Sequence, residues 1–186
     1  MKRILTIALL LLGASLTAQT GAETFWSNLQ KHCGKAYEGQ LIEPENDEGF
    51  AGKKLIMHVR SCSAKEIKVP FFVGDDLSRT WVFTKKKGVI TLKHDHRHED
   101  GSEDEVTQYG GTATNTGSGN LQMFPADQHT ATLLPRAATN VWSVSIDENS
   151  YGYNLSRIYN NTVFKVTFDL TQPISTPEAP WGWKEK

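Results

Sequence analysis

An alternating run of apolar residues and histidines is the strongest constraint on how this chain folds. Ile90 and Leu92 are followed, at the same two-residue spacing, by His94, His96 and His98. Residues two apart point to the same face of a β-strand, so the pattern predicts a strand whose apolar stripe continues into a stripe of histidines. We expect that stripe at the edge of a core or in a cavity, where imidazoles bind metal ions, exchange protons or hold a polar ligand.

Short strand-like runs continue along the rest of the chain, separated by turn residues. Only 23–31 has a helical pattern, in which Phe25 and Leu29 share a face and Thr24 is the expected N-cap. Strands that follow one another hairpin by hairpin predict an all-β protein, an up-and-down antiparallel β-barrel of about 8–10 strands with a short N-terminal helix. A β-sandwich is the alternative. The expected strands are at 34–42, 54–60, 67–73, 79–84, 89–98, 106–109, 121–124, 141–146, 151–155 and 163–170.

The two ends of the chain differ in composition from the middle. A charged start, an apolar run over 4–12 and small residues up to Ala18 and Ala22 are typical of a secretory signal peptide over 1–22. A single barrel domain is then expected over 23–172 and a tail containing proline and tryptophan over 173–186. The mature protein should be periplasmic or secreted, with no transmembrane segment.

Charge excludes one class of partner. The formal net charge of the full chain is −1, and removal of the signal peptide takes away two further cations, Lys2 and Arg3. The mature chain therefore has no basic excess for binding nucleic acid.

The chain has two cysteines, Cys33 and Cys62, which an exported protein is expected to join as a disulfide. If they lie opposite each other in an antiparallel hairpin, the turn is centred between Asp47 and Glu48, in the strongest turn composition nearby. We expect this bond to staple the first hairpin, because no Cys-x-x-Cys pair indicates redox chemistry.

Two further strands carry candidate ligand-binding residues. Arg79 shares its strand phase with Trp81 and Phe83, so all three are expected to face inward. A buried guanidinium requires either an internal carboxylate or an acidic ligand. Tyr109 precedes paired glycines, which permit close approach of the backbone to a ligand or to another strand.

The layout resembles that of the calycins, the superfamily of lipocalins and fatty-acid-binding proteins. The similar segments are the short helix with Trp26 and Leu29, and the Gly34-Lys35-Ala36-Tyr37 sequence that opens the first strand. Ala36 stands where lipocalins have tryptophan. Ser156-Arg157 is similar to the late arginine that calycins pack over the helix, and the resemblance implies a barrel that holds a ligand.

These observations leave three functions open. The first is an exported barrel that binds a hydrophobic or amphipathic small molecule, which Arg79 anchors if it is acidic. The second is a metal-binding protein or metal-dependent enzyme, with a divalent transition metal on His94, His96 and His98. The third is an interaction module without a pocket. The residues expected to bind the small molecule are Arg79, Trp81, His94, His96, His98, Tyr109 and Arg157; no catalytic residue is indicated.

Overall fold

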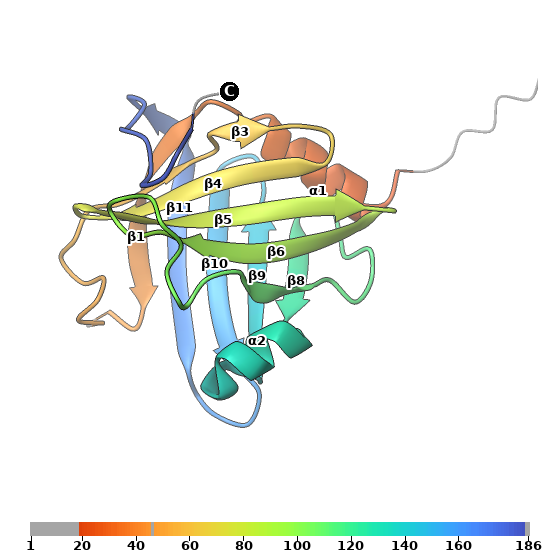
Figure 1. Ribbon diagram of the computed structural model, residues 1–186. Helices are drawn as coiled ribbons and strands as arrows, with labels where there is room; N and C mark the ends of the chain where they lie inside the picture. Colours follow the sequence, from red (N-terminus) through yellow and green to blue (C-terminus); the bar gives the residue numbers. More distant parts are fainter. Residues whose placement is uncertain (1–18, 46, 185–186) are drawn as a thin grey trace, which may run out of the picture.

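The protein is a nearly closed barrel made from one antiparallel sheet, as seen in a computed structural model that describes residues 19–45 and 47–184 (Figure 1). This confirms the predicted all-β, up-and-down barrel with a short N-terminal helix, and it is compatible with a calycin-like fold. The strands are β1 (Ala36–Glu43), β2 (Leu55–His58), β3 (Ser61–Cys62), β4 (Glu66–Val73), β5 (Asp76–Lys86), β6 (Val89–His96), β7 (Tyr109–Thr112), β8 (Leu121–Pro125), β9 (Asn140–Ile146), β10 (Ser150–Arg157) and β11 (Val163–Ile174). The helices are α1 (Gly21–Gln30), α2 (Gln128–Leu133) and the 3₁₀ turn η1 (Pro135–Ala137).

The sheet runs as two meanders joined through the first strand. Its order is β7-β6-β5-β4-β2-β1-β11-β10-β9-β8, and the short β3 pairs with β4 beside this path. Because β1 pairs with both β2 and β11, it closes one side of the barrel, and the remaining seam lies between β7 and β8.

The seam is closed by a close approach of two backbones. The Asp127 N–H donates to the carbonyl of Gly110 at 3.0 Å, and the Thr130 hydroxyl accepts from the N–H of Gly110 and donates to its carbonyl, both at 2.7 Å. A Cβ on Gly111 would lie 1.7 Å from the carbonyl oxygen of Pro125. The paired glycines therefore serve the approach to another strand that the sequence suggested.

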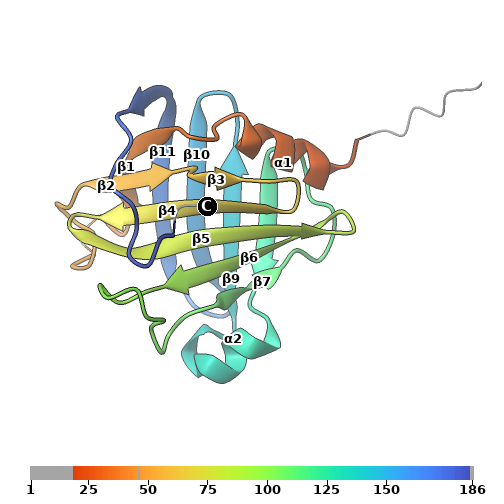
Figure 2. The same ribbon diagram turned by 45° about the horizontal axis from the view of Figure 1, so that its top comes forward.

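Helix α1 covers one end of the barrel, while α2 and η1 lie at the other (Figure 2). The apolar face of α1, formed by Ala22, Phe25, Trp26 and Leu29, is buried in the core. The sequence predicts a helix that begins at Glu23 with Thr24 as its cap, and both are wrong: the start lies two residues earlier and the cap four residues earlier. Thr20 is the N-cap, and a reciprocal bond from Glu23 completes a capping box, which satisfies two backbone N–H groups that a later start would leave exposed.

The disulfide between Cys33 and Cys62 is present, as predicted, but the expected register is not. The first hairpin pairs Ala36 with His58 and Tyr37 with Met57, one residue away from the register in which the cysteines face each other. Cys33 follows α1, and Cys62 lies in β3, which pairs with β4. The bond therefore links the end of the helix to the edge of the sheet, rather than two partners in one ladder.

The predicted phase of β5 and β6 is confirmed. Ile90, Leu92 and His94 are buried in succession, and Trp81 and Phe83 are buried on the neighbouring strand. The histidine stripe thus begins inside the barrel, directly after the apolar core.

The predicted signal peptide falls mostly on residues 1–18, which lie outside the described residues. After β11, the tail crosses the outer face of the sheet, where the Trp181 N–H donates to the carbonyl of Leu77 and Trp183 lies beneath the guanidinium of Arg60. No helix among residues 19–45 and 47–184 is long and apolar enough to cross a membrane.

Candidate functional site

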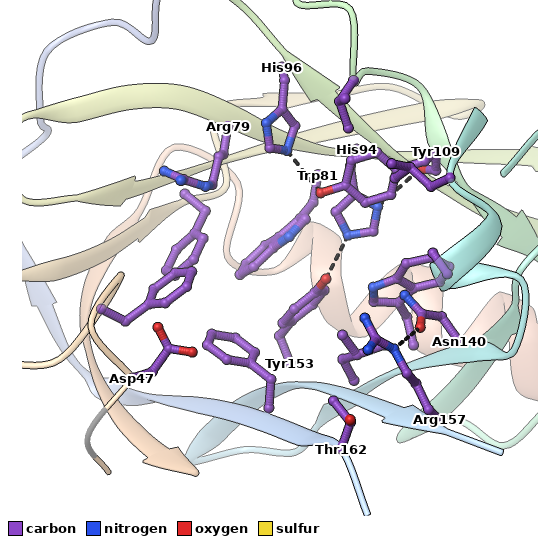
Figure 3. Close-up of a pocket in the computed structure, with 18 of the residues that line it drawn as sticks. Asp47, Arg79, Trp81, His94, His96, Tyr109, Asn140, Tyr153, Arg157 and Thr162 are labelled. Atoms are coloured by element: carbon purple, nitrogen blue, oxygen red, sulfur yellow. Dashed lines mark hydrogen bonds between the residues drawn. The ribbon is translucent and has the colours of Figure 1, made fainter. Parts of the chain in front are cut away.

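A cavity of about 530 Å³ opens at the end of the barrel away from α1 (Figure 3). The inward-facing residues of β5, β6, β9 and β10 form its walls, and the segment after α2 lies at its mouth. Its apolar lining is largely aromatic, and it includes Phe50, Phe71, Trp81, Trp142, Tyr153 and Phe164.

The cavity brings together most of the residues that the sequence singled out. Those at its wall are Arg79, Trp81, His94, His96, Tyr109 and Arg157. His98 does not reach it, because β6 ends at His96 and His98 is exposed. Binding of a ligand by these side chains stays a prediction, but their convergence on one space is a property of the fold.

His94 is fully engaged by the protein. Its Nδ1 lies 3.0 Å from the carbonyl oxygen of Tyr109, and its Nε2 lies 2.6 Å from the hydroxyl of Tyr153. A carbonyl only accepts, so Nδ1 carries the ring hydrogen and Nε2 accepts from the tyrosine. Burial lowers the pKa of His94 to about 3, which keeps the ring neutral. His94 therefore holds two strands together and presents no free nitrogen to the cavity.

His96 and Arg79 form the second polar group at the wall. Nε2 of His96 is 3.0 Å from the hydroxyl of Tyr109, whose pKa burial raises to about 12. Burial, followed by the charge of Arg79, lowers the pKa of His96. Arg79 is paired with Asp76 and lies over the ring of Phe50, 5.7 Å from its centroid. The sequence left open an internal ion pair or an acidic ligand for Arg79, and the fold supplies the ion pair.

Stacked rings form one wall of the cavity. Trp81 is nearly parallel to Phe71, with centroids 4.7 Å apart, and to Tyr153, with centroids 4.4 Å apart. The Tyr153 hydroxyl is held by Nε2 of His94. Rings fixed in this way give a rigid apolar surface that does not need to form on binding.

Arg157 lies in a different place from the one implied by the calycin resemblance. It does not cover the helix; a different cation, Lys85 in the β5–β6 hairpin, lies 5.0 Å from the ring centroid of Trp26 in α1. Arg157 ends the inward row of β10 at the far end of the barrel, where its Nε donates to Oδ1 of Asn140 at 2.7 Å. The direction of β10 explains why Arg157 lies far from α1. The strand runs toward the cavity, so its last residue lies at the cavity and its first residues lie deeper in the barrel.

The described part of the chain offers no metal centre. No group of three His, Cys, Asp or Glu side chains within residues 19–45 and 47–184 is arranged to hold an ion. The three histidines of the stripe do not converge, since His94 is consumed by hydrogen bonds and His98 is exposed. The geometry therefore gives no support to the metal-binding alternative.

Several lining residues were not found from the sequence. Tyr153 shares its phase along β10 with the predicted Arg157, and Trp142 occupies the inward row of β9, so alternation held the signal for both missed residues. Asn140 and Arg136 lie at the start of β9 and in η1, where no periodicity marks the inward side.

Comparison of the chain with protein-family models, with curated proteins and with solved structures gives no match.

Proposed function

We propose that this protein is an exported barrel that binds a small amphipathic molecule in the cavity described above. The observation that carries the proposal is a preformed space of about 530 Å³ with aromatic walls and a few fixed polar groups. Cavities of roughly 300–1,000 Å³ with this lining are the usual sites for small organic ligands.

The interior of the barrel is filled with side chains at one end and open at the other, which supports ligand binding over a purely structural role. A barrel of about eight strands is just wide enough either to be filled by its own side chains or to hold one small ligand. Here the half next to α1 is filled, by Phe25, Leu29, Phe83 and Phe124 among others, whereas the half next to α2 is not. An interaction module without a pocket has no need for this arrangement.

Export is part of the proposal. The residues before α1 have the composition of a signal peptide, and the disulfide between Cys33 and Cys62 requires an oxidising compartment to persist. A ligand in such a compartment would come from outside the cell or from its envelope.

Native mass spectrometry of the mature protein, purified from its exported compartment without detergent, tests the proposal directly. We expect a fraction of molecules with an additional mass of a few hundred daltons, which is lost on denaturation.

A matched pair of substitutions locates the ligand. Leu155→Trp adds bulk to the inward row of β10 at the cavity, whereas Leu121→Trp adds the same bulk to the outer face of β8, where Leu121 is 40% exposed. The additional mass should disappear in Leu155→Trp and persist in Leu121→Trp. Bare protein in all three preparations, together with no response to added amphipathic probes, would overturn the proposal.

A further inference from the structure

Charged side chains at the cavity fall into two groups with different partners. Arg79 is neutralised by Asp76, so its charge is balanced within the protein. Arg136 and Arg157 also line the cavity, but neither has an acidic side chain within 4.0 Å in the described part of the chain. The unbalanced positive charge is therefore at the mouth, beside β9 and β10.

The partner of Arg157 is a neutral amide. A guanidinium only donates, so the Asn140 atom that faces its Nε is the carbonyl oxygen, and the amide nitrogen of Asn140 points elsewhere. Asn140 is only 4% exposed, and Arg157 is its direct cross-strand neighbour. This bond fixes the guanidinium without cancelling its charge.

Nitrogen atoms of three side chains at the mouth of the cavity are left without a partner among the described residues. The Nη atoms of Arg157, the amide N–H groups of Asn140 and the guanidinium of Arg136 are donors, and no hydrogen bond between residues of the described part of the chain uses them. A group of donors with net positive charge, in which Asn140 holds the guanidinium of Arg157, matches a carboxylate, sulfonate or phosphate. Asp47, the single carboxylate among the described lining residues, lies across the cavity from Arg157 and accepts from the N–H of Gly49 (Figure 3).

We propose that the natural ligand is an organic anion, whose acidic group binds to Arg157, Arg136 and Asn140 while its apolar body lies along the stacked rings of Trp81 and Tyr153. This rests on the proposed function, and it adds the charge of the ligand and its orientation. The anchor differs from the one that the sequence indicated, since Arg79 already has an internal partner.

Two fluorescent probes that differ by one group test the proposal. 1-Anilinonaphthalene-8-sulfonate carries a sulfonate, and N-phenyl-1-naphthylamine has the same ring system without it. Both are titrated into the mature, disulfide-bonded protein, and the dissociation constants are compared. We expect the anionic probe to bind the wild-type protein at least about tenfold more tightly, the usual effect of a charge-assisted hydrogen bond.

Three variants locate the effect. Arg157→Gln removes the charge, and Asn140→Asp keeps the acceptor for Arg157 but places a carboxylate where the anion would bind. Both should weaken the anionic probe by about tenfold and change the neutral probe by less than about twofold. Arg97→Gln is the control, because Arg97 lies on the outer face in ion pairs with Asp95 and Glu103. Asn140→Asp also guards against misfolding, since it preserves the size and the hydrogen bond of the residue that it replaces.

The outcomes separate the two proposals. Equal binding of both probes by the wild-type protein, or equal weakening of the anionic probe by Arg97→Gln, would overturn the anion site and leave the binding cavity intact. Failure of the wild-type protein to bind either probe would overturn both. Selective loss of the anionic probe in Arg157→Gln and Asn140→Asp would establish the site.

Discussion

The hydroxyl of Tyr153 donates to Nε2 of His94 across 2.6 Å, while the hydroxyl of Tyr151, on the same face of β10, has no hydrogen-bond partner among the described residues. Both tyrosines are buried, and burial raises the pKa of each. The two tyrosines are two residues apart in β10, and their hydroxyl groups thus make opposite contributions to the stability of the barrel.

Phenylalanine substitutions at these two positions should have opposite effects. Tyr153→Phe leaves Nε2 of His94 as a buried acceptor without a donor, so we expect the free energy of unfolding to fall by about 1–3 kcal/mol. Tyr151→Phe removes a buried hydroxyl that has no partner, so stability should stay the same or rise by about 1 kcal/mol. Urea unfolding followed by tryptophan fluorescence measures both. A loss in Tyr151→Phe as large as that in Tyr153→Phe would show that the Tyr151 hydroxyl does have a partner.

The neutral state of His94 predicts a pH dependence of stability. Burial lowers the pKa of His94 to about 3 in the fold, from the ordinary histidine value of 6.5, so between these pH values the unfolded chain binds a proton that the folded protein does not bind. The contribution is fully present above pH 6.5 and is lost as the pH falls from 6.5 toward 3. The slope attributable to this residue approaches about 1.4 kcal/mol per pH unit within that window.

Denaturation at pH 7.5, 6.5, 5.5 and 4.5 tests this dependence in the wild type and in two variants. His94→Gln should flatten the curve, because glutamine does not titrate. His98→Gln should leave it unchanged, since His98 is exposed. His32, His58 and His96 also have lowered pKa values, so a residual slope will remain in His94→Gln. Parallel curves for the wild type and His94→Gln would contradict the assignment.

Alternation in the sequence predicted most of the barrel, because it reports directly on which side of a strand is buried. The phase of Ile90, Leu92 and His94, and that of Trp81 and Phe83, could be predicted because strands repeat every two residues irrespective of their neighbours. The disulfide could be predicted from two cysteines and an N-terminal composition typical of a signal peptide.

The site could be predicted only in part, because its remaining features depend on where strands end. Arg157 and Asn140 meet because the last residue of β10 pairs with the first residue of β9, and that register is set by the turn between them. Likewise, the register of the first hairpin differs by one residue from the expected one, because the cysteines are joined outside the ladder. Sequence patterns contain little information on either point.

The disulfide between Cys33 and Cys62 should stabilise the fold by lowering the conformational entropy of the unfolded chain. The bridged residues are 29 apart, for which the chain-entropy model gives about 3–4 kcal/mol. We expect a lower melting temperature in the presence of a reductant, measured by circular dichroism. The Cys33→Ser/Cys62→Ser double variant should melt at that lower temperature with or without the reductant. A melting temperature of the wild type that does not respond to reduction would count against a structural role for the bond.

The start of α1 predicts where the mature chain begins. Thr20 caps the helix and Ala22 is fully buried in the core, so both residues belong to the folded domain. Cleavage at the end of the expected signal peptide, after Ala22, would remove the cap and a core side chain together, whereas cleavage after the small residue Ala18 would keep both. The intact mass of the exported protein should therefore correspond to a chain that begins at Gln19. Thr20→Ala should lower the stability of that chain by about 1 kcal/mol, the usual value of an N-cap. A mature chain that begins at Glu23 and is as stable as one that begins at Gln19 would show that the capping box contributes nothing, because the two forms differ in that first turn alone.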